Sequence, residues 1–146
     1  MQPAIDHIHI TVQNLARAQA FYDAFLPALG FDIALKEQID EAAHEYAAVE
    51  YHHKNLSIAI VAPRPALAQK APHRRRPGAL HHLAFRAQSP AEVDAACTAA
   101  RAAGAKVLHP PRLWPEYCPD YYAFFCKDSE GNELEVVHFD RPRYFP

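Results

Sequence analysis

The chain has 146 residues, of which 50% are hydrophobic and 22% are charged, and its formal net charge at pH 7 is −2. This is the composition of a globular protein, and it excludes a disordered or collagen-like chain. The small net charge provides no field that would hold nucleic acid or an anionic membrane, so we expect neither as a partner. The chain begins without a basic-then-apolar leader, no apolar run approaches a membrane span, and three cysteines form no paired framework. We therefore expect a cytoplasmic protein.

The first half of the chain is predicted to contain one strand, one helix and three further strands. Residues 5–12 alternate and are rich in β-branched side chains, which is typical of a strand. A helix is predicted over residues 15–29, because apolar residues recur at i, i+4 and i+8 from Phe21. Pro27 predicts a frayed or kinked last turn. Three strands follow, at residues 31–37, 46–52 and 56–62.

The second half repeats this order after a linker. Residues 63–79 hold four prolines and little periodicity, and we interpret them as the linker. A strand at residues 81–87 and a helix over residues 91–103 follow, with Ser89 and Pro90 at the helix start. Three more strands are predicted at residues 106–109, 121–127 and 133–139.

The predicted fold class is α+β, with two tandem β-α-β-β-β modules that form a curved mixed sheet with helices on one face. We expect a single domain over residues 1–146. Within it, residues 1–62 form the first module, residues 80–140 form the second module, and residues 141–146 form a C-terminal tail.

The two modules resemble each other in sequence. With an offset of 75 residues, His7 falls on His82 and the apolar residues that follow each histidine coincide. A duplication at about half the chain length indicates two packed copies of one supersecondary unit. It also places one histidine at the same position in each copy, and two such histidines can converge on one metal ion.

Three motifs in a fixed order accompany this repeat. They are Asp6-His7-Ile8 with Phe21-Tyr22 and Leu29-Gly30-Phe31, then His82-Leu83-Ala84-Phe85, then Asp128-Ser129-Glu130-Gly131-Asn132-Glu133-Leu134-Glu135-Val136. With the paired module order, they resemble the vicinal oxygen chelate superfamily, which includes glyoxalase I, extradiol dioxygenases and the bleomycin-resistance proteins. In the last motif, Ser129 takes the place of the family's usual proline.

The resemblance implies a divalent metal in a cup formed by the curved sheets. Carried over to this chain, the ligands are His7, His82 and Glu135. The matching carboxylate position of the first module falls on Ala59, which cannot bind a metal, and Glu50 on the preceding strand is a weak substitute. Two imidazoles and one carboxylate leave positions open for two substrate oxygens, or for a substrate and dioxygen. This set suits Fe(II), and Mn, Zn, Ni and Co stay open.

Residues 110–122 form a second informative segment, because four prolines stiffen it and one tryptophan and three tyrosines give it apolar bulk with polar ends. Such a loop is suited to close over a small, partly aromatic ligand. Core packing of Trp114 and Tyr122 is the alternative interpretation. Arg112 is a candidate to bind an anionic group of the substrate.

The likeness to extradiol dioxygenases suggests further site residues. Those enzymes carry a tyrosine ten positions before the ligand glutamate, where this chain has Phe125, with Tyr122 three residues earlier. They also use an acid-base histidine in the preceding loop, where this chain has Glu116 and Tyr117. The catalytic candidates are therefore Tyr122, Glu116 and Tyr117, and the substrate-binding candidates are Ala59, Trp114, Arg112 and Phe125.

These patterns predict a metal-dependent enzyme of the lyase or ring-cleaving dioxygenase type that acts on a small oxygenated substrate. The alternative is a metal-independent small-molecule binding protein of the bleomycin-resistance type. We also expect a homodimer, because exposed sheet edges usually need covering and the tail ends in two aromatic residues before Pro146.

Overall fold

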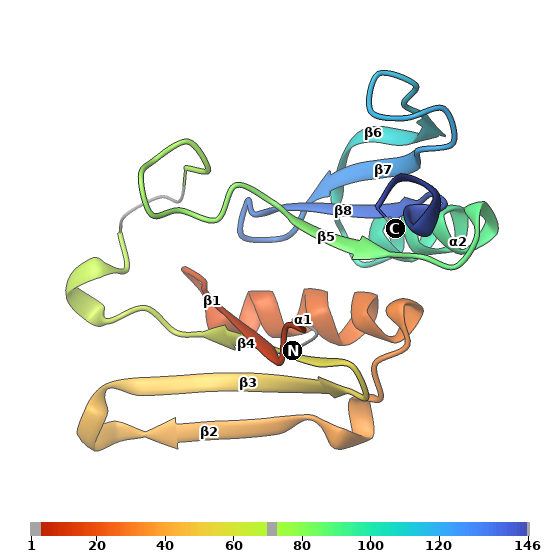
Figure 1. Ribbon diagram of the computed structural model, residues 1–146. Helices are drawn as coiled ribbons and strands as arrows, with labels where there is room; N and C mark the ends of the chain where they lie inside the picture. Colours follow the sequence, from red (N-terminus) through yellow and green to blue (C-terminus); the bar gives the residue numbers. More distant parts are fainter. Residues whose placement is uncertain (1–3, 70–72, 146) are drawn as a thin grey trace. The chain divides into compact units, whose positions relative to one another are not determined.

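A computed structural model describes residues 4–69 and 73–145 (Figure 1). The chain divides into two units, Met1–Pro72 and His73–Pro146, and each is described by itself. Each unit contains one open, four-stranded mixed sheet and one long helix. The predicted α+β class with two β-α-β-β-β modules is therefore confirmed.

The sheet of the first unit is mixed, with a parallel pair at one edge. Its strands lie in the order β1 (His7–Thr11), β4 (Leu56–Val61), β3 (Tyr46–His53) and β2 (Glu37–Glu41). Strand β1 runs parallel to β4, and the other neighbours are antiparallel. Helix α1 (Leu15–Phe25) contacts β3 and β4. The hydroxyl of Tyr51 on β3 donates a hydrogen bond of 2.9 Å to Asp23 on this helix, which fixes the helix-facing side of the sheet.

The predicted break near Pro27 is confirmed. Helix α1 ends at Phe25, and the chain continues as the 3₁₀ turn η1 (Leu26–Leu29). Proline has no N–H to continue the α-helical ladder. Gly30, with φ of 89°, closes the turn by donating from its backbone N–H to the carbonyl of Pro27 at 3.0 Å.

The strand predicted at residues 31–37 is wrong. The short 3₁₀ turn η2 (Ile33–Leu35) lies there, and the Asp32 carboxylate accepts a hydrogen bond of 2.9 Å from the N–H of Ala34 at its start. This local bond gives the backbone an alternative to strand pairing. The true second strand, β2, is a charged and mostly exposed edge strand without the apolar alternation that predicts strands.

The second unit repeats the arrangement of the first. Its strands lie in the order β5 (Leu83–Arg86), β8 (Glu133–His138), β7 (Tyr122–Lys127) and β6 (Lys106–Leu113), with β5 parallel to β8. Helix α2 (Pro90–Ala102) contacts β6, β7 and β8. The hydrophobic core between helix and sheet contains Val93, Ala96, Cys97, Ala100, Phe124, Leu134 and Val136, all buried.

Strand β6 is longer than the predicted segment of residues 106–109. It continues to Leu113 through two prolines, with register shifts on both sides of His109. Prolines are tolerated there because β6 is an edge strand and its pairing with β7 is interrupted at these positions, so fewer backbone N–H groups have to donate to a neighbouring strand. The aromatic loop therefore begins at Trp114, four residues later than expected from residue 110.

Short elements complete the chain. They are the 3₁₀ turns η3 (Ala42–His44) and η4 (Pro65–Leu67) and the single-turn helix α3 (Arg141–Tyr144). The predicted linker over residues 63–79 includes residues 70–72, and the predicted tail ends at Pro146, all of which lie outside the described residues. Within the described residues, the helices are all too short or too polar to cross a membrane.

Strand alternation divides the side chains of each sheet between a helix-covered face and a second face, which we call the open face. By strand register, the open face of the first sheet carries His7, His9, Glu37, Tyr46, Glu50, His52, Ser57 and Ala59. The open face of the second sheet carries Ala84, Arg86, His109, Ala123, Phe125, Glu135 and Val137. Most titratable side chains of the strands thus share these two faces.

Candidate functional site

The open face of the second sheet contains a buried carboxylate with two partners. Glu135 lies in the middle of β8 and is only 3% exposed. Its Oε1 accepts a hydrogen bond of 2.6 Å from the hydroxyl of Tyr121. Its Oε2 lies 3.5 Å from Nε2 of His82, the residue immediately before β5. Two residues of the expected ligand set, His82 and Glu135, therefore lie together.

The imidazole of His82 is oriented for this contact. Its Nδ1 shares a hydrogen bond of 2.8 Å with Nδ1 of His81, which leaves Nε2 free to face Glu135. Histidines that bind metals commonly have the second ring nitrogen fixed in this way. His81 thus acts as a neighbour that selects the orientation of the ring.

Burial dominates the electrostatics of Glu135. It raises the pKa of this carboxyl, and Glu133 acts in the same direction, while the Tyr121 hydrogen bond and the nearby His82 oppose the rise. Burial and the bond to Glu135 likewise raise the pKa of Tyr121, so its hydroxyl stays protonated and donates at neutral pH. An ionised carboxylate in such a place is costly without a cation partner. A divalent metal beside His82 would provide one.

The structure corrects the role expected for Tyr122. Its hydroxyl donates a hydrogen bond of 2.9 Å to Asp94 on α2, so its side chain lies on the helix-covered face. Tyr121, one residue earlier, contacts Glu135 instead. Successive side chains of an extended segment point to opposite faces, so a shift of one residue separates a structural tyrosine from one at the site.

The expected substrate residues of the aromatic loop belong to a packed cluster. Trp114 is buried against Phe125, with ring centroids 5.1 Å apart, and its Nε1 donates a 3.1 Å hydrogen bond to the carbonyl of Ala123. The guanidinium of Arg112 lies 3.5 Å from the Trp114 ring centroid and 3.8 Å from the carboxylate of Glu116. Core packing therefore accounts for Trp114 and Phe125, and Arg112 and Glu116 are occupied with each other.

A cavity of about 520 Å³ lies in the second unit beside Tyr121. Tyr117, another predicted residue, lines it, and the rings of Tyr117 and Tyr121 lie 5.1 Å apart. Ala84, directly opposite Glu135 in the strand register, also lines the cavity. The rest of the wall is mostly aromatic and basic, with Phe139, Tyr144, Phe145, Arg86 and Arg141 beside Cys118 and Val137. This cavity is a place for a small ligand next to the buried carboxylate.

In the first unit, the Nδ1 of His7 lies 2.8 Å from the Asp6 carboxylate, and both side chains are exposed. Ala59 is buried and pairs with His9 on one side, as Glu135 pairs with Ala84 in the second unit. The register thus gives Ala59 the place of Glu135. Since His7 belongs to the first unit, its sharing of a metal with His82 and Glu135 stays a prediction.

Several polar residues were missed from the sequence, and the internal repeat contained the information needed to find some of them. The offset of 75 residues that aligns His7 with His82 also aligns Tyr46 with Tyr121. Both tyrosines lie next to the start of an equivalent strand, and both hydroxyls contact a polar residue of the open face, His9 in the first unit and Glu135 in the second. Comparing all strands of the modules, beyond the opening strands, would have identified this pair.

Comparisons with known proteins agree with this geometry. The model of the Glyoxalase/Bleomycin resistance protein/Dioxygenase superfamily matches residues 4–136. The chain belongs to this superfamily. The resemblance found in the sequence is therefore confirmed, and the two open four-stranded sheets are those of the superfamily's two-module fold.

Relatives of this superfamily member cover nearly its whole length. It is 28% identical over 131 residues to the uncharacterized protein YqjT of Bacillus subtilis (strain 168), covering 90% of this chain and 95% of that protein. A glyoxalase/bleomycin resistance protein from Albidiferax ferrireducens T118 is 27% identical, with a TM-score of 0.66 and coverage of 92% and 97%. A glyoxylase/bleomycin resistance protein/dioxygenase domain from Frankia sp. EAN1pec, 18% identical with a TM-score of 0.74 and coverage of 94% and 98%, shares the fold.

Replacing Glu135 with glutamine tests the electrostatics of the buried carboxylate. Burial raises its pKa in the folded state, so the ionised group lowers stability, and this cost is absent below the ordinary pKa of 4.5 and grows as the pH rises through the raised value. Glutamine keeps an acceptor for Tyr121. We expect metal-free Glu135→Gln protein to gain about 1 kcal/mol in free energy of unfolding at pH 7, and nothing at pH 4.

Denaturant unfolding of metal-free protein across this pH range measures the difference. Glu116→Gln, which changes an exposed carboxylate of the same unit, is the matched control and should behave as the wild type at both pH values. A Glu135→Gln protein that is less stable than the wild type at pH 7 would contradict the interpretation.

Proposed function

We propose that this chain is a metal-dependent enzyme that binds a small oxygenated substrate beside Glu135. The observation that carries the proposal is the buried carboxylate of Glu135, with Nε2 of His82 only 3.5 Å away and the ring of His82 fixed by His81. Ligand atoms on one metal ion lie roughly 3 Å apart when each bond is about 2.1 Å long. A small side-chain movement brings this pair to that geometry.

The donor types suit a first-row divalent metal. Imidazole and carboxylate without thiolate are compatible with Fe(II), Mn, Zn, Ni or Co. We propose His7 as the third ligand, because it occupies in the first module the sequence position that His82 occupies in the second. When bound, such a metal supplies a Lewis acid that polarises substrate oxygens. Ala59 in place of a fourth protein ligand leaves more of the coordination sphere to the substrate.

Neighbouring residues prepare the site. The Tyr121 hydroxyl holds one oxygen of Glu135 and leaves the other facing His82. The adjoining cavity offers Tyr117 and Phe139 as apolar walls for the body of the substrate. Arg86 and Arg141 line the same cavity, and no carboxylate pairs with either guanidinium in the part of the chain that the structure describes. We propose that they attract a negatively charged group of the substrate.

The alternative function is metal-independent binding of a small molecule, as in the bleomycin-resistance type of protein. The cavity favours it, because aromatic side chains line a volume of about 520 Å³ and Glu135 itself is not part of the wall. The two functions differ in whether the protein needs a bound metal ion to act on its small molecule. For either one we propose a reducing cytoplasm as the location, in line with Cys97, Cys118 and Cys126 all being free.

Removal of a single ligand should remove one bound metal. We expect His82→Ala and His7→Ala proteins, purified without chelator or nickel resin, to contain one equivalent less than the wild type by elemental analysis. His44→Ala, a change at an exposed histidine in η3, is the control and should keep the full metal content. If both ligand variants keep as much metal as the wild type, the metal-dependent function is wrong.

We also propose that the protein is a homodimer. The tail packs partly on its own unit, since the Tyr144 hydroxyl donates a 2.7 Å hydrogen bond to Asp120, but the ring of Phe145 stays 61% exposed. An exposed aromatic ring in this position favours a contact with another chain. Light scattering at micromolar concentration should give twice the chain mass of 16.4 kDa, and the monomer mass would rule the dimer out.

A further inference from the structure

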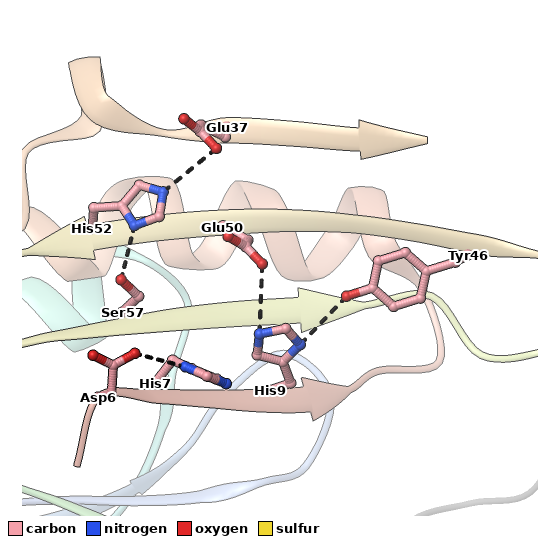
Figure 2. Close-up of polar contacts among 8 residues, drawn as sticks. All are labelled: Asp6, His7, His9, Glu37, Tyr46, Glu50, His52 and Ser57. Atoms are coloured by element: carbon pink, nitrogen blue, oxygen red, sulfur yellow. Dashed lines mark hydrogen bonds and ion pairs between the residues drawn. The ribbon is translucent and has the colours of Figure 1, made fainter. Parts of the chain in front are cut away.

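Two rows of side chains cross the open face of the first sheet, and the proposed function uses only His7 and Ala59 of them. In the first row, His9, Ala59, Glu50 and Glu37 are register partners across the strands β1, β4, β3 and β2. In the second row, His7, Ser57 and His52 are register partners across β1, β4 and β3. Figure 2 shows the polar side chains of both rows, together with Asp6 and Tyr46.

The small side chain of Ala59 lets its two neighbours meet. His9 and Glu50 lie on strands separated by a whole strand, so their backbones are about 9.6 Å apart. Only the methyl group of Ala59 stands between them, and Nε2 of His9 comes within 3.5 Å of the Glu50 carboxylate. Ala59, which stands where the resemblance places a metal ligand, thus allows His9 and Glu50 to come together.

His9, His52, Glu37 and Glu50 form a cluster on this face. The rings of both of its histidines are held by hydroxyl groups. Nδ1 of His52 shares a 2.8 Å hydrogen bond with Ser57, and Nδ1 of His9 shares a 3.3 Å hydrogen bond with Tyr46. Each Nε2 then points to a carboxylate, at 3.9 Å from Glu37 for His52 and 3.5 Å from Glu50 for His9 (Figure 2). This arrangement leaves the second ring nitrogen as the available ligand atom.

The two carboxylates of the cluster lie opposite each other and have no lysine or arginine partner among the described residues. Glu37 and Glu50 are direct partners on β2 and β3, a placement in which like charges destabilise a sheet. Within residues 4–69 and 73–145, no lysine or arginine forms an ion pair with either of them. In the part of the chain that the structure describes, their ionic partners are histidines, His9 for Glu50 and His52 for Glu37.

The ligand atoms lie close enough for one ion. One ligand atom each from Glu37, Glu50 and His52 can be chosen so that all three lie within 4.8 Å of one another. Ligands about 2.1 Å from a shared ion lie roughly 3 to 4 Å apart. The remaining adjustment falls on the side chain of Glu37, which is 68% exposed and free to rotate toward the others.

We propose that the first unit contains a divalent metal site of its own, with Glu37, Glu50 and His52 as ligands and His9 next to them. Its mixed nitrogen and oxygen donors suit Zn²⁺, Mn²⁺, Fe²⁺ or Co²⁺. An ion there joins the charged edge strand β2 to β3 and removes the repulsion between the two carboxylates. All of its ligands belong to the first unit, and they do not include His7, His82 or Glu135.

Titration of the metal-free, full-length protein with Zn²⁺ in a calorimeter tests the site. We expect Glu37→Gln and Glu50→Gln proteins to lose one equivalent, or to bind it at least tenfold more weakly, while Glu135→Gln keeps that equivalent. Glu41→Gln is the matched control, because Glu41 lies on the same strand and face as Glu37 but opposite Tyr46. The control should bind Zn²⁺ as the wild type does.

A second readout uses stability. Zn²⁺ should raise the thermal unfolding temperature of the wild-type and Glu135→Gln proteins, and it should raise that of the Glu50→Gln and His52→Gln proteins much less. Glu50→Gln protein that binds and is stabilised as the wild type overturns the proposal, as does complete loss of Zn²⁺ binding in the Glu135→Gln protein alone. Loss only in the Glu37 and Glu50 variants supports this site and counts against the proposed function of Glu135.

Discussion

Each sheet of this protein packs one long helix against one of its faces, and this packing decides which strand positions are apolar. Strand alternation sends every second side chain toward the helix, so apolar residues such as Ile58 and Leu134 occupy those positions. The alternate positions do not face the helix, and several of them carry polar groups. Glu50 and Glu135 both lie at such positions, which is why the titratable residues of the strands gather on the open faces.

The two modules share the same strand register, but equivalent positions on the open faces carry different side chains. On the central strand, Ala59 corresponds to Glu135, and on the next strand Glu50 corresponds to Phe125. The glutamate of this row therefore lies on β3 in the first unit and on β8 in the second unit. In the second unit this leaves a buried glutamate in contact with Tyr121 and His82, and in the first unit it leaves a partly exposed cluster of histidines and glutamates. We expect the copies to bind metals with different strength for this reason.

The sequence was sufficient for the repeat and the fold class, because these depend on periodicity. The pairing of His82 with Glu135 was an expectation from the family resemblance, and the structure places Nε2 of His82 3.5 Å from the Glu135 carboxylate. Strand β2 could not be predicted, since its charged edge residues carry no apolar alternation. Tyr121 was missed in favour of Tyr122 because the extended chain reverses the facing of consecutive residues. The cluster around Glu50 depends on contacts across three strands, which spacing along the chain does not reveal.

We propose above all that Glu135 and His82 bind one metal ion. Crystals grown with Zn²⁺ and measured at the zinc absorption edge test it most directly, because anomalous scattering locates the ion without reference to activity. If both residues are ligands, an anomalous peak will lie about 2.0–2.2 Å from Nε2 of His82 and from a carboxylate oxygen of Glu135. Crystals that contain zinc but show no peak within bonding distance of these two residues would contradict it.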